Sequence, residues 1–159
     1  MGEKIGDYGS RMLWEKLGME NDAKWILDHK DGNEKTFSGV YATARDYAKI
    51  GKLYMNHGKM YGEQIVDSSY VVASISPLNI PDTDGRNTDY YGYAWWLTNY
   101  KGYEVFYMRG ILGQYVICVP GKNLIITRLG QLRSKTKSKD GVTPDDVWAY
   151  LDESFALID

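Results

Sequence analysis

"RGILGQYVICVP", residues 109–120, places an arginine and two glycines directly before an apolar run. The run "YVICV" is almost continuously apolar, which is typical of a strand that is buried on both faces. Glycine weakens a strand unless another group approaches its backbone closely or the chain bends sharply there. The stretch therefore predicts either a tight turn into a buried strand or the edge of a site that binds a ligand.

Three more extended runs surround this stretch: "YGYAWWLT" (91–98), "YEVFYMR" (103–109) and "NLIITRL" (123–129). Short connections such as "GKN" favour hairpins, so the four runs predict an antiparallel sheet. The segment "LIIT" is as apolar as "YVICV", and we expect both of its faces to be covered as well. After the sheet, "TPDDVWAYLDESFALI" predicts a helix with Thr143 as its N-cap and Pro144 as its first residue.

The first half of the chain is richer in helix signals. The segment "TARDYAKIGKLYMNHG" has a capping pair, Thr43 and Asp46, an apolar stripe, and Gly58 to end it. We also expect helices over 7–17 and 67–75, short strands within 23–27 and 35–41, and a surface loop over 77–90. The fold class predicted is α+β: a single unit, 1–159, with a mostly helical segment over 1–90 followed by antiparallel strands and a C-terminal helix over 91–159.

Composition excludes several classes of function. The formal net charge is −2 and no long basic block is present, so we expect no nucleic-acid partner. No apolar run approaches the roughly 18 residues that a membrane-spanning helix needs. The single cysteine, Cys118, cannot form an internal disulfide, and its apolar neighbours favour a small buried residue over a reactive thiol.

Histidines and short motifs give no self-contained active site. His29 lies in a charged turn and His57 ends a helix, and neither has cysteine or carboxylate neighbours at ligand spacing, so we expect no metal and no cofactor. No Gly-x-Ser-x-Gly elbow is present. "SKTK" (134–137) fits the Ser-x-x-Lys pair of penicillin-recognising hydrolases, but it lies in "RSKTKSKDG", which we expect to be a basic, disordered bridge. "YMN" (54–56) fits their Tyr-x-Asn element but lies within an amphipathic helix. We interpret both as chance matches.

Longer segments nevertheless resemble one superfamily in order and spacing. They are "LWEKLGMEND", "YATARDYAKIGKLYMNHGKMYGEQIV", "YGYAWWL" and "RGILGQYVICVPGKNLIITRLG". This arrangement is similar to that of serine β-lactamase-like hydrolases, which include the penicillin-binding proteins. It most resembles the branch of class C β-lactamase-related esterases and 6-aminohexanoate-oligomer hydrolases. The resemblance implies the C-terminal part of the β-lactamase/transpeptidase-like fold, and a small-molecule amide or ester substrate that is cleaved through an acyl-enzyme.

The resemblance also assigns roles to the opening stretch. In this family a strand at the edge of the catalytic cleft begins with a Lys-Thr-Gly or His-x-Gly-like element, and a backbone N–H just after the glycine forms half of the oxyanion hole. Here Gly110 matches the glycine and the N–H of Ile111 matches the oxyanion donor. Arg109 and Gln114 are candidates for substrate contact, although Met108 and Arg109 stand where other branches have Lys-Thr. Without that lysine, Arg109 is the replacement cation for a substrate carboxylate.

The neighbouring aromatic residues leave two interpretations open. Tyr91, Tyr93, Trp95 and Trp96 either wall the cleft, with Trp95 contacting substrate, or alternate as ordinary half-buried strand packing.

The family's Ser-x-x-Lys and Tyr-x-Asn elements precede the segment with which this chain begins. We therefore expect the chain to lack a nucleophile, and to pair along 124–129 with the N-terminal half of the fold or with a second copy. Two other functions stay open: a non-catalytic module that binds glycans or peptides, and a pseudo-hydrolase that serves as a sensor. The resemblance further implies a periplasmic or cell-envelope location for the parent protein.

Overall fold

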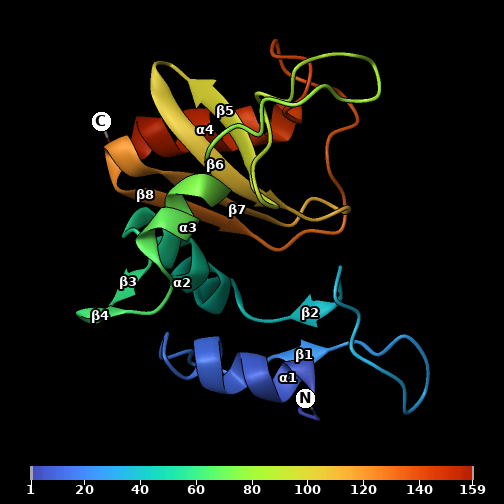
Figure 1. Ribbon diagram of the computed structural model, residues 1–159. Helices are drawn as coiled ribbons and strands as arrows, with labels where there is room; N and C mark the ends of the chain where they lie inside the picture. The colour runs from blue at the N-terminus through green and yellow to red at the C-terminus, as the bar shows by residue number, and fades with distance from the viewer. Residues whose placement is uncertain (1, 159) are drawn as a thin grey trace.

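The computed structural model of the chain describes residues 2–158, and a four-stranded antiparallel sheet organises it (Figure 1). The strands are β5 (Trp96–Tyr100), β6 (Tyr103–Arg109), β7 (Tyr115–Val119) and β8 (Leu124–Arg128), and they lie side by side in chain order. Successive hairpins connect them, with Trp96 opposite Tyr107, Arg109 opposite Tyr115, and Tyr115 opposite Arg128. The sheet predicted from the four apolar runs is confirmed, although the first strand begins at Trp96 rather than at Tyr91.

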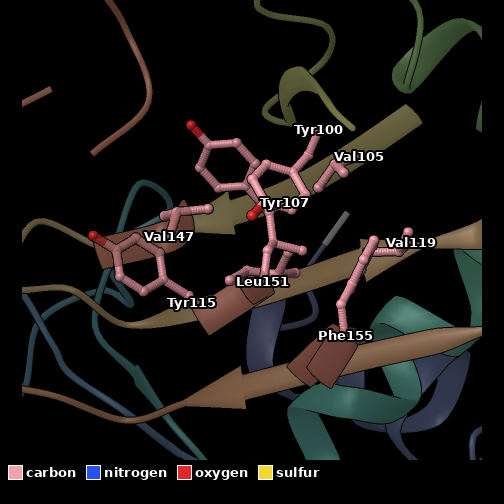
Figure 2. Close-up of a cluster of buried hydrophobic side chains, with 9 residues drawn as sticks. Tyr100, Val105, Tyr107, Tyr115, Val119, Val147, Leu151 and Phe155 are labelled. Atoms are coloured by element: carbon pink, nitrogen blue, oxygen red, sulfur yellow. The ribbon is translucent and has the colours of Figure 1, made fainter. Parts of the chain in front are cut away.

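Helices cover the sheet on both sides. Helix α4 (Asp145–Ile158) packs on one face, where side chains of β6 and β7 meet Val147, Leu151 and Phe155 (Figure 2). Helix α2 (Ala44–Met55) packs against β7 and β8 on the other face. All five residues of β7 are buried, which confirms the prediction from "YVICV". Strand β8 is only half-buried along its length, so the expectation that both of its faces are covered was too strong.

Close packing of α2 on the sheet depends on Gly51. A Cβ at this position would lie 2.8 Å from Sγ of Cys118 and 3.0 Å from Cγ1 of Val116. Cys118 itself is fully buried, and burial raises the pKa of its thiol. Its environment is that of the small buried residue expected from its apolar neighbours.

The N-terminal segment differs from the single helix predicted over 7–17. An α-helix, α1 (Ile5–Gly9), runs into a π-helical stretch (Ser10–Trp14), and the chain turns at Gly18, where φ is +58°. The helix begins at Ile5, two residues before the predicted start, and Lys4 at its N-cap makes no side-chain capping hydrogen bond. The short strands β1 (Lys24–Trp25) and β2 (Val40–Tyr41) pair antiparallel as expected.

Side chains cap the next two helices, the first of them as predicted. Thr43 caps α2 by accepting a hydrogen bond from the N–H of Asp46, and Asp67 caps α3 (Ser68–Ser74) in the same manner. Gly58 ends the first of these with a positive φ of +82° and donates to the carbonyl of Leu53 at 2.8 Å. Between them lies a small hairpin, β3 (Lys59–Met60) with β4 (Glu63–Gln64), for which the sequence carries no clear strand pattern.

Asp46 does more than the capping pair suggests. Its carboxylate is fully buried and accepts hydrogen bonds from the N–H of Glu20 at 2.7 Å and from the side chains of Thr43 and Asn21. Burial opposes its ionisation, but these hydrogen bonds outweigh burial and hold its pKa below the usual value. The ionised side chain therefore ties the first turn of α2 to the N-terminal segment.

The bridge into the last helix is ordered, contrary to the expectation of a disordered segment. Its bends are held by Asp140, whose carboxylate accepts hydrogen bonds from Ser138, Thr143 and the N–H of Val142. Helix α4 begins at Asp145, one residue after the start predicted from Pro144, and the Thr143 hydroxyl bonds to Asp140. A three-residue 3₁₀ turn (Pro120–Lys122) joins β7 to β8.

Candidate functional site

The opening stretch forms the hairpin between β6 and β7. Arg109 is the last residue of β6, and one more rung, from the N–H of Gly110 to the carbonyl of Gln114 at 2.8 Å, closes the turn. The Arg109–Gly110 pair therefore ends a strand, and the expectation that it begins one is corrected. The two strands separate at this point, which leaves the turn at one end of the sheet.

Both glycines of the turn have local reasons to be glycine. Gly113 has a φ of +82°, which favours glycine, and a Cβ there would lie 2.7 Å from the carbonyl oxygen of Leu132. A Cβ on Gly110 would overlap the side chain of Gln114. The close approach that the sequence predicts is thus made by the chain's own neighbouring groups at both positions.

Ile111 lies at the tip of the turn, with 81% of its surface exposed. The N–H of Leu112 donates to Oε1 of Gln114, and the N–H of Gly113 donates to the carbonyl of Gly110, each at 3.2 Å. Within residues 2–158 the N–H of Ile111 has no hydrogen-bond acceptor. This donor is outside the strand ladder, and it is available to an acceptor that this chain does not supply.

Gln114 is used by the turn itself. Its Oε1 accepts from Leu112, and its Nε2 donates to the carbonyl of Gly130 at 2.6 Å. Both ends of the side-chain amide are therefore bound inside the chain, and the residue holds the turn against the segment that follows β8. The structure supplies this shaping role, which the sequence did not suggest.

The aromatic candidates are divided between the two faces of the sheet. Trp95 is 4% exposed and packs against Phe106 and Tyr54, with ring centroids 5.1 and 4.6 Å apart. The expected contact of Trp95 with a substrate is therefore corrected, because its side chain is buried on the α2 face of the sheet. Trp96 is half-buried on the opposite face, close to the rings of Tyr91 and Tyr107.

Arg109 lies on the same face as Trp96. The guanidinium carbon of Arg109 is 3.4 Å from the centroid of the Trp96 ring, which is a close cation–π contact. Arg109 also lines a cavity of about 220 Å³ at the end of the sheet near the start of α4. We call this cavity the basic pocket; its walls are Arg109, Arg133, Ser134, Lys135, Thr136, Lys137, Val142 and Pro144.

The two short motifs do not have catalytic geometry. Ser134 is in an irregular segment, where its hydroxyl bonds to that of Thr136 at 2.8 Å, and Lys137 is exposed. A serine–lysine pair of the penicillin-recognising type needs its serine at the start of a helix with the lysine buried beside it. Tyr54 of "YMN" lies in α2 and packs on Trp95. The structure agrees with their interpretation as chance matches.

The histidines take part in local contacts. His29 is in an exposed turn beside Asp28, with Nδ1 2.8 Å from a carboxylate oxygen, and His57 lies just beyond the end of α2 with a positive φ. Over residues 2–158, no group of three or more His, Cys, Asp or Glu side chains is placed to hold a metal ion. The described helices are all too short or too polar to cross a membrane.

No family model matches this sequence. Solved structures share its architecture, among them the following two. A protein assigned as a 6-aminohexanoate-dimer hydrolase from Bacillus anthracis superposes with a TM-score of 0.77 over 99% of this chain, at 25% sequence identity. The fold is that of the C-terminal portion of a β-lactamase-like hydrolase. A protein assigned as a β-lactamase from Bacteroides dorei DSM 17855 matches 90% of the chain with a TM-score of 0.65, and its 17% identity supports the fold alone.

The chain accounts for only part of each of these proteins. It covers 39% of the Bacillus anthracis protein and 48% of the Bacteroides dorei protein. The β-lactamase-like fold inferred from the four sequence segments is thereby confirmed.

Proposed function

We propose that the chain forms one wall of the active site of a serine hydrolase that cleaves an amide or ester through an acyl-enzyme. The observation that carries the proposal is the N–H of Ile111, which stands at the end of the sheet without an acceptor among residues 2–158. The likeness to the Bacillus anthracis protein, which is assigned as a hydrolase, supports the reaction class.

Each residue of the turn then has a defined task. A serine that lies outside residues 1–159 attacks the substrate carbonyl, and the N–H of Ile111 donates to the oxyanion that develops on the carbonyl oxygen. Because Gly110 has no side chain, the substrate oxygen can come close to the N–H of Ile111. Gln114 holds the turn in place through its hydrogen bond to the carbonyl of Gly130. Arg109 is placed two residues before the donor to contact the part of the substrate beyond the scissile bond.

A matched pair of variants tests the role of the backbone donor. In the complete hydrolase that contains this chain, Ile111→Pro removes the N–H, whereas Ile111→Ala shortens the side chain and keeps the N–H. Loss of one oxyanion donor costs about 10²–10³ in kcat. We therefore expect Ile111→Pro to lower kcat by this factor and Ile111→Ala to stay near the parent value. Oligomers of 6-aminohexanoate, short esters and a chromogenic cephalosporin are the substrates to compare.

The oxyanion assignment requires that Ile111→Pro have a much lower kcat than Ile111→Ala. Circular dichroism and thermal unfolding should confirm that both fold, because the side chain is largely exposed. Equal activity of Ile111→Pro and Ile111→Ala would remove the oxyanion assignment. Complete absence of hydrolysis by the parent protein on all three substrate classes would favour a binding or sensor module.

A further inference from the structure

The basic pocket gathers positive charge from two separate parts of the chain. Arg109 reaches it from the end of β6, whereas Arg133, Lys135 and Lys137 come from the segment between β8 and α4. The chain as a whole has a net charge of −2, so these four cations form a local positive region on a negatively charged protein. Cations that converge on one cavity repel one another unless an anion lies between them.

No carboxylate of the described chain neutralises these cations. None of the four forms an ion pair with an Asp or Glu among residues 2–158. Asp146 lies behind the pocket wall, where its two oxygens accept from the Tyr115 hydroxyl and from the N–H of Ser134, each at 3.1 Å. Its carboxylate therefore orders the wall rather than pairing with an arginine.

Arg109 is held in place before any ligand arrives. Its guanidinium stacks on Trp96 and is half-buried at the end of a sheet strand, so it loses little freedom on binding. Burial lowers its pKa, and the positive charge of Arg133 lowers it further. An arginine stays protonated in proteins despite such shifts, so both guanidinium groups remain charged donors beside the cavity.

The opposite wall is also ordered. The N–H of Ser134 is bound by Asp146, and Asp140 fixes the bends around Ser138 and Thr143. Ser134 and Thr136 line the same cavity as the cations, and their hydroxyl groups lie 2.8 Å apart. Such a set of guanidinium, ammonium and hydroxyl donors is suited to an oxyanion with several acceptor atoms.

We propose that the basic pocket binds a small ligand with a multivalent oxyanion group, either a phosphate or two to three carboxylates on one short carbon chain. Several unneutralised cations favour more than one negative charge, and the cavity of about 220 Å³ accommodates a group of this size. The proposal concerns binding on the α4 face of the sheet and stands whether or not the turn serves a hydrolase.

Direct titration of the chain tests the proposal. Inorganic phosphate, citrate and acetate are added separately at low ionic strength, and binding is followed by calorimetry and by shifts of backbone amide resonances. We expect saturable binding of phosphate or citrate, with shifts confined to 133–137 and Arg109, and much weaker binding of acetate. Comparison of the phosphate and citrate titrations shows whether the pocket prefers a phosphate group or several carboxylates. Binding should weaken as sodium chloride is raised, because the cations are partly exposed.

Two variants complete the test. Arg133→Ala removes an exposed guanidinium from the pocket, and Lys139→Ala removes an exposed ammonium from the same segment outside the pocket. We expect the first to weaken binding about tenfold, which corresponds to one charge-assisted contact, and the second to have little effect. Equal losses in both variants would show non-specific attraction to a basic segment and overturn the proposal. Absence of saturable binding of either multivalent anion at millimolar concentration would also overturn it.

Discussion

The hydroxyl of Thr98 donates a hydrogen bond of 3.0 Å to Asp140 and so joins β5 to the segment that precedes α4. The other oxygen of Asp140 accepts from the N–H groups of Val142 and Thr143, each at 2.8 Å. Burial opposes ionisation of this carboxyl, but the hydrogen bonds outweigh it and lower its pKa to about 2. The position of the basic pocket wall therefore depends on a carboxylate that must be ionised.

Stability should fall in acid through Asp140. A pKa that is lower in the folded state than in the unfolded state gives stability above the unfolded value, near 3.8, and this stability is lost as the pH falls toward about 2. Because the group is only partly buried, we expect a contribution of about 1 kcal/mol, discounted for solvent screening. Urea unfolding of the parent chain and Asp140→Asn at several pH values between 2 and 6 measures it.

The stability difference between Asp140→Asn and the parent chain should depend on pH. Asp140→Asn should be less stable than the parent at pH 6, and the difference should shrink as the pH falls below about 4. Asp22→Asn, at an exposed aspartate, is the matched control and should follow the parent. A difference between Asp140→Asn and the parent that is constant over this pH range would contradict the ionised carboxylate.

A methyl group at Gly51 should destabilise the chain. Alanine favours a helix interior over glycine by about 1 kcal/mol, but overpacking against Cys118 and Val116 costs about 1–3 kcal/mol. We expect Gly51→Ala to lower the free energy of unfolding by about 1 kcal/mol on balance. Thermal or urea unfolding measures this value.

Two companion variants locate the cause. Cys118→Ala removes the sulfur that a Cβ at position 51 would meet, so the double variant should lose less than the sum of the single changes. Gly9 has helical φ and ψ angles and open space around its Cα, so Gly9→Ala should be neutral or stabilising. If Gly51→Ala behaves like Gly9→Ala, the close approach of α2 to the sheet is not as tight as described.

The chain by itself should be inert toward serine-directed reagents. Ser134 is bonded to Thr136 within an irregular segment and has no buried lysine beside it. Purified residues 1–159 should therefore neither hydrolyse nitrophenyl esters above a buffer blank nor react with a fluorophosphonate or penicillin probe. Mass spectrometry of the treated chain gives the result, and an adduct on Ser134 would restore "SKTK" as a catalytic element.

Strand β8 should pair with another strand. It bonds to β7 on one side only within the described chain, and the apolar residues Leu124, Ile125 and Ile126 form this edge. The only charge of the strand, Arg128, lies at its end, and an apolar edge without proline is a template for further pairing. We expect a dimer or larger assembly at micromolar concentration in sedimentation velocity, with amide exchange along 124–128 slowing as concentration rises. A monomer whose edge amides exchange rapidly at all concentrations would contradict this.

Local chemistry made much of the fold predictable. Thr43 and Asp67 are good caps, Gly58 supplies a left-handed stop, and the apolar runs of β6 to β8 have short connections. The π-helical stretch Ser10–Trp14 was not predictable, because a single π-helical turn joined to an α-helix is too short to leave an apolar pattern of its own. The order of the 133–141 segment was also missed, since it depends on the contact of Asp140 with Thr98, 42 residues away.

The candidate site was predictable only in part. The turn around Gly110 was singled out from its glycines, but the pairing of Gln114 with Gly130 depends on how the end of β8 returns to the hairpin. Alternation along the strand separated Trp95 from Trp96, although it could not say which ring faces α2. The basic pocket was hidden because its four cations are contributed by β6 and by a segment interpreted as a solvated bridge.

The burial of Asp46 bears on the order in which the chain folds. Its partners Glu20 and Asn21 are 26 and 25 residues away, so they arrive only after a long loop has closed. Until then a charged group at the first turn of α2 must keep its water shell, and that turn cannot dock. The N-terminal segment and the start of α2 should therefore become protected from solvent in the same kinetic step, later than the hairpins of the sheet.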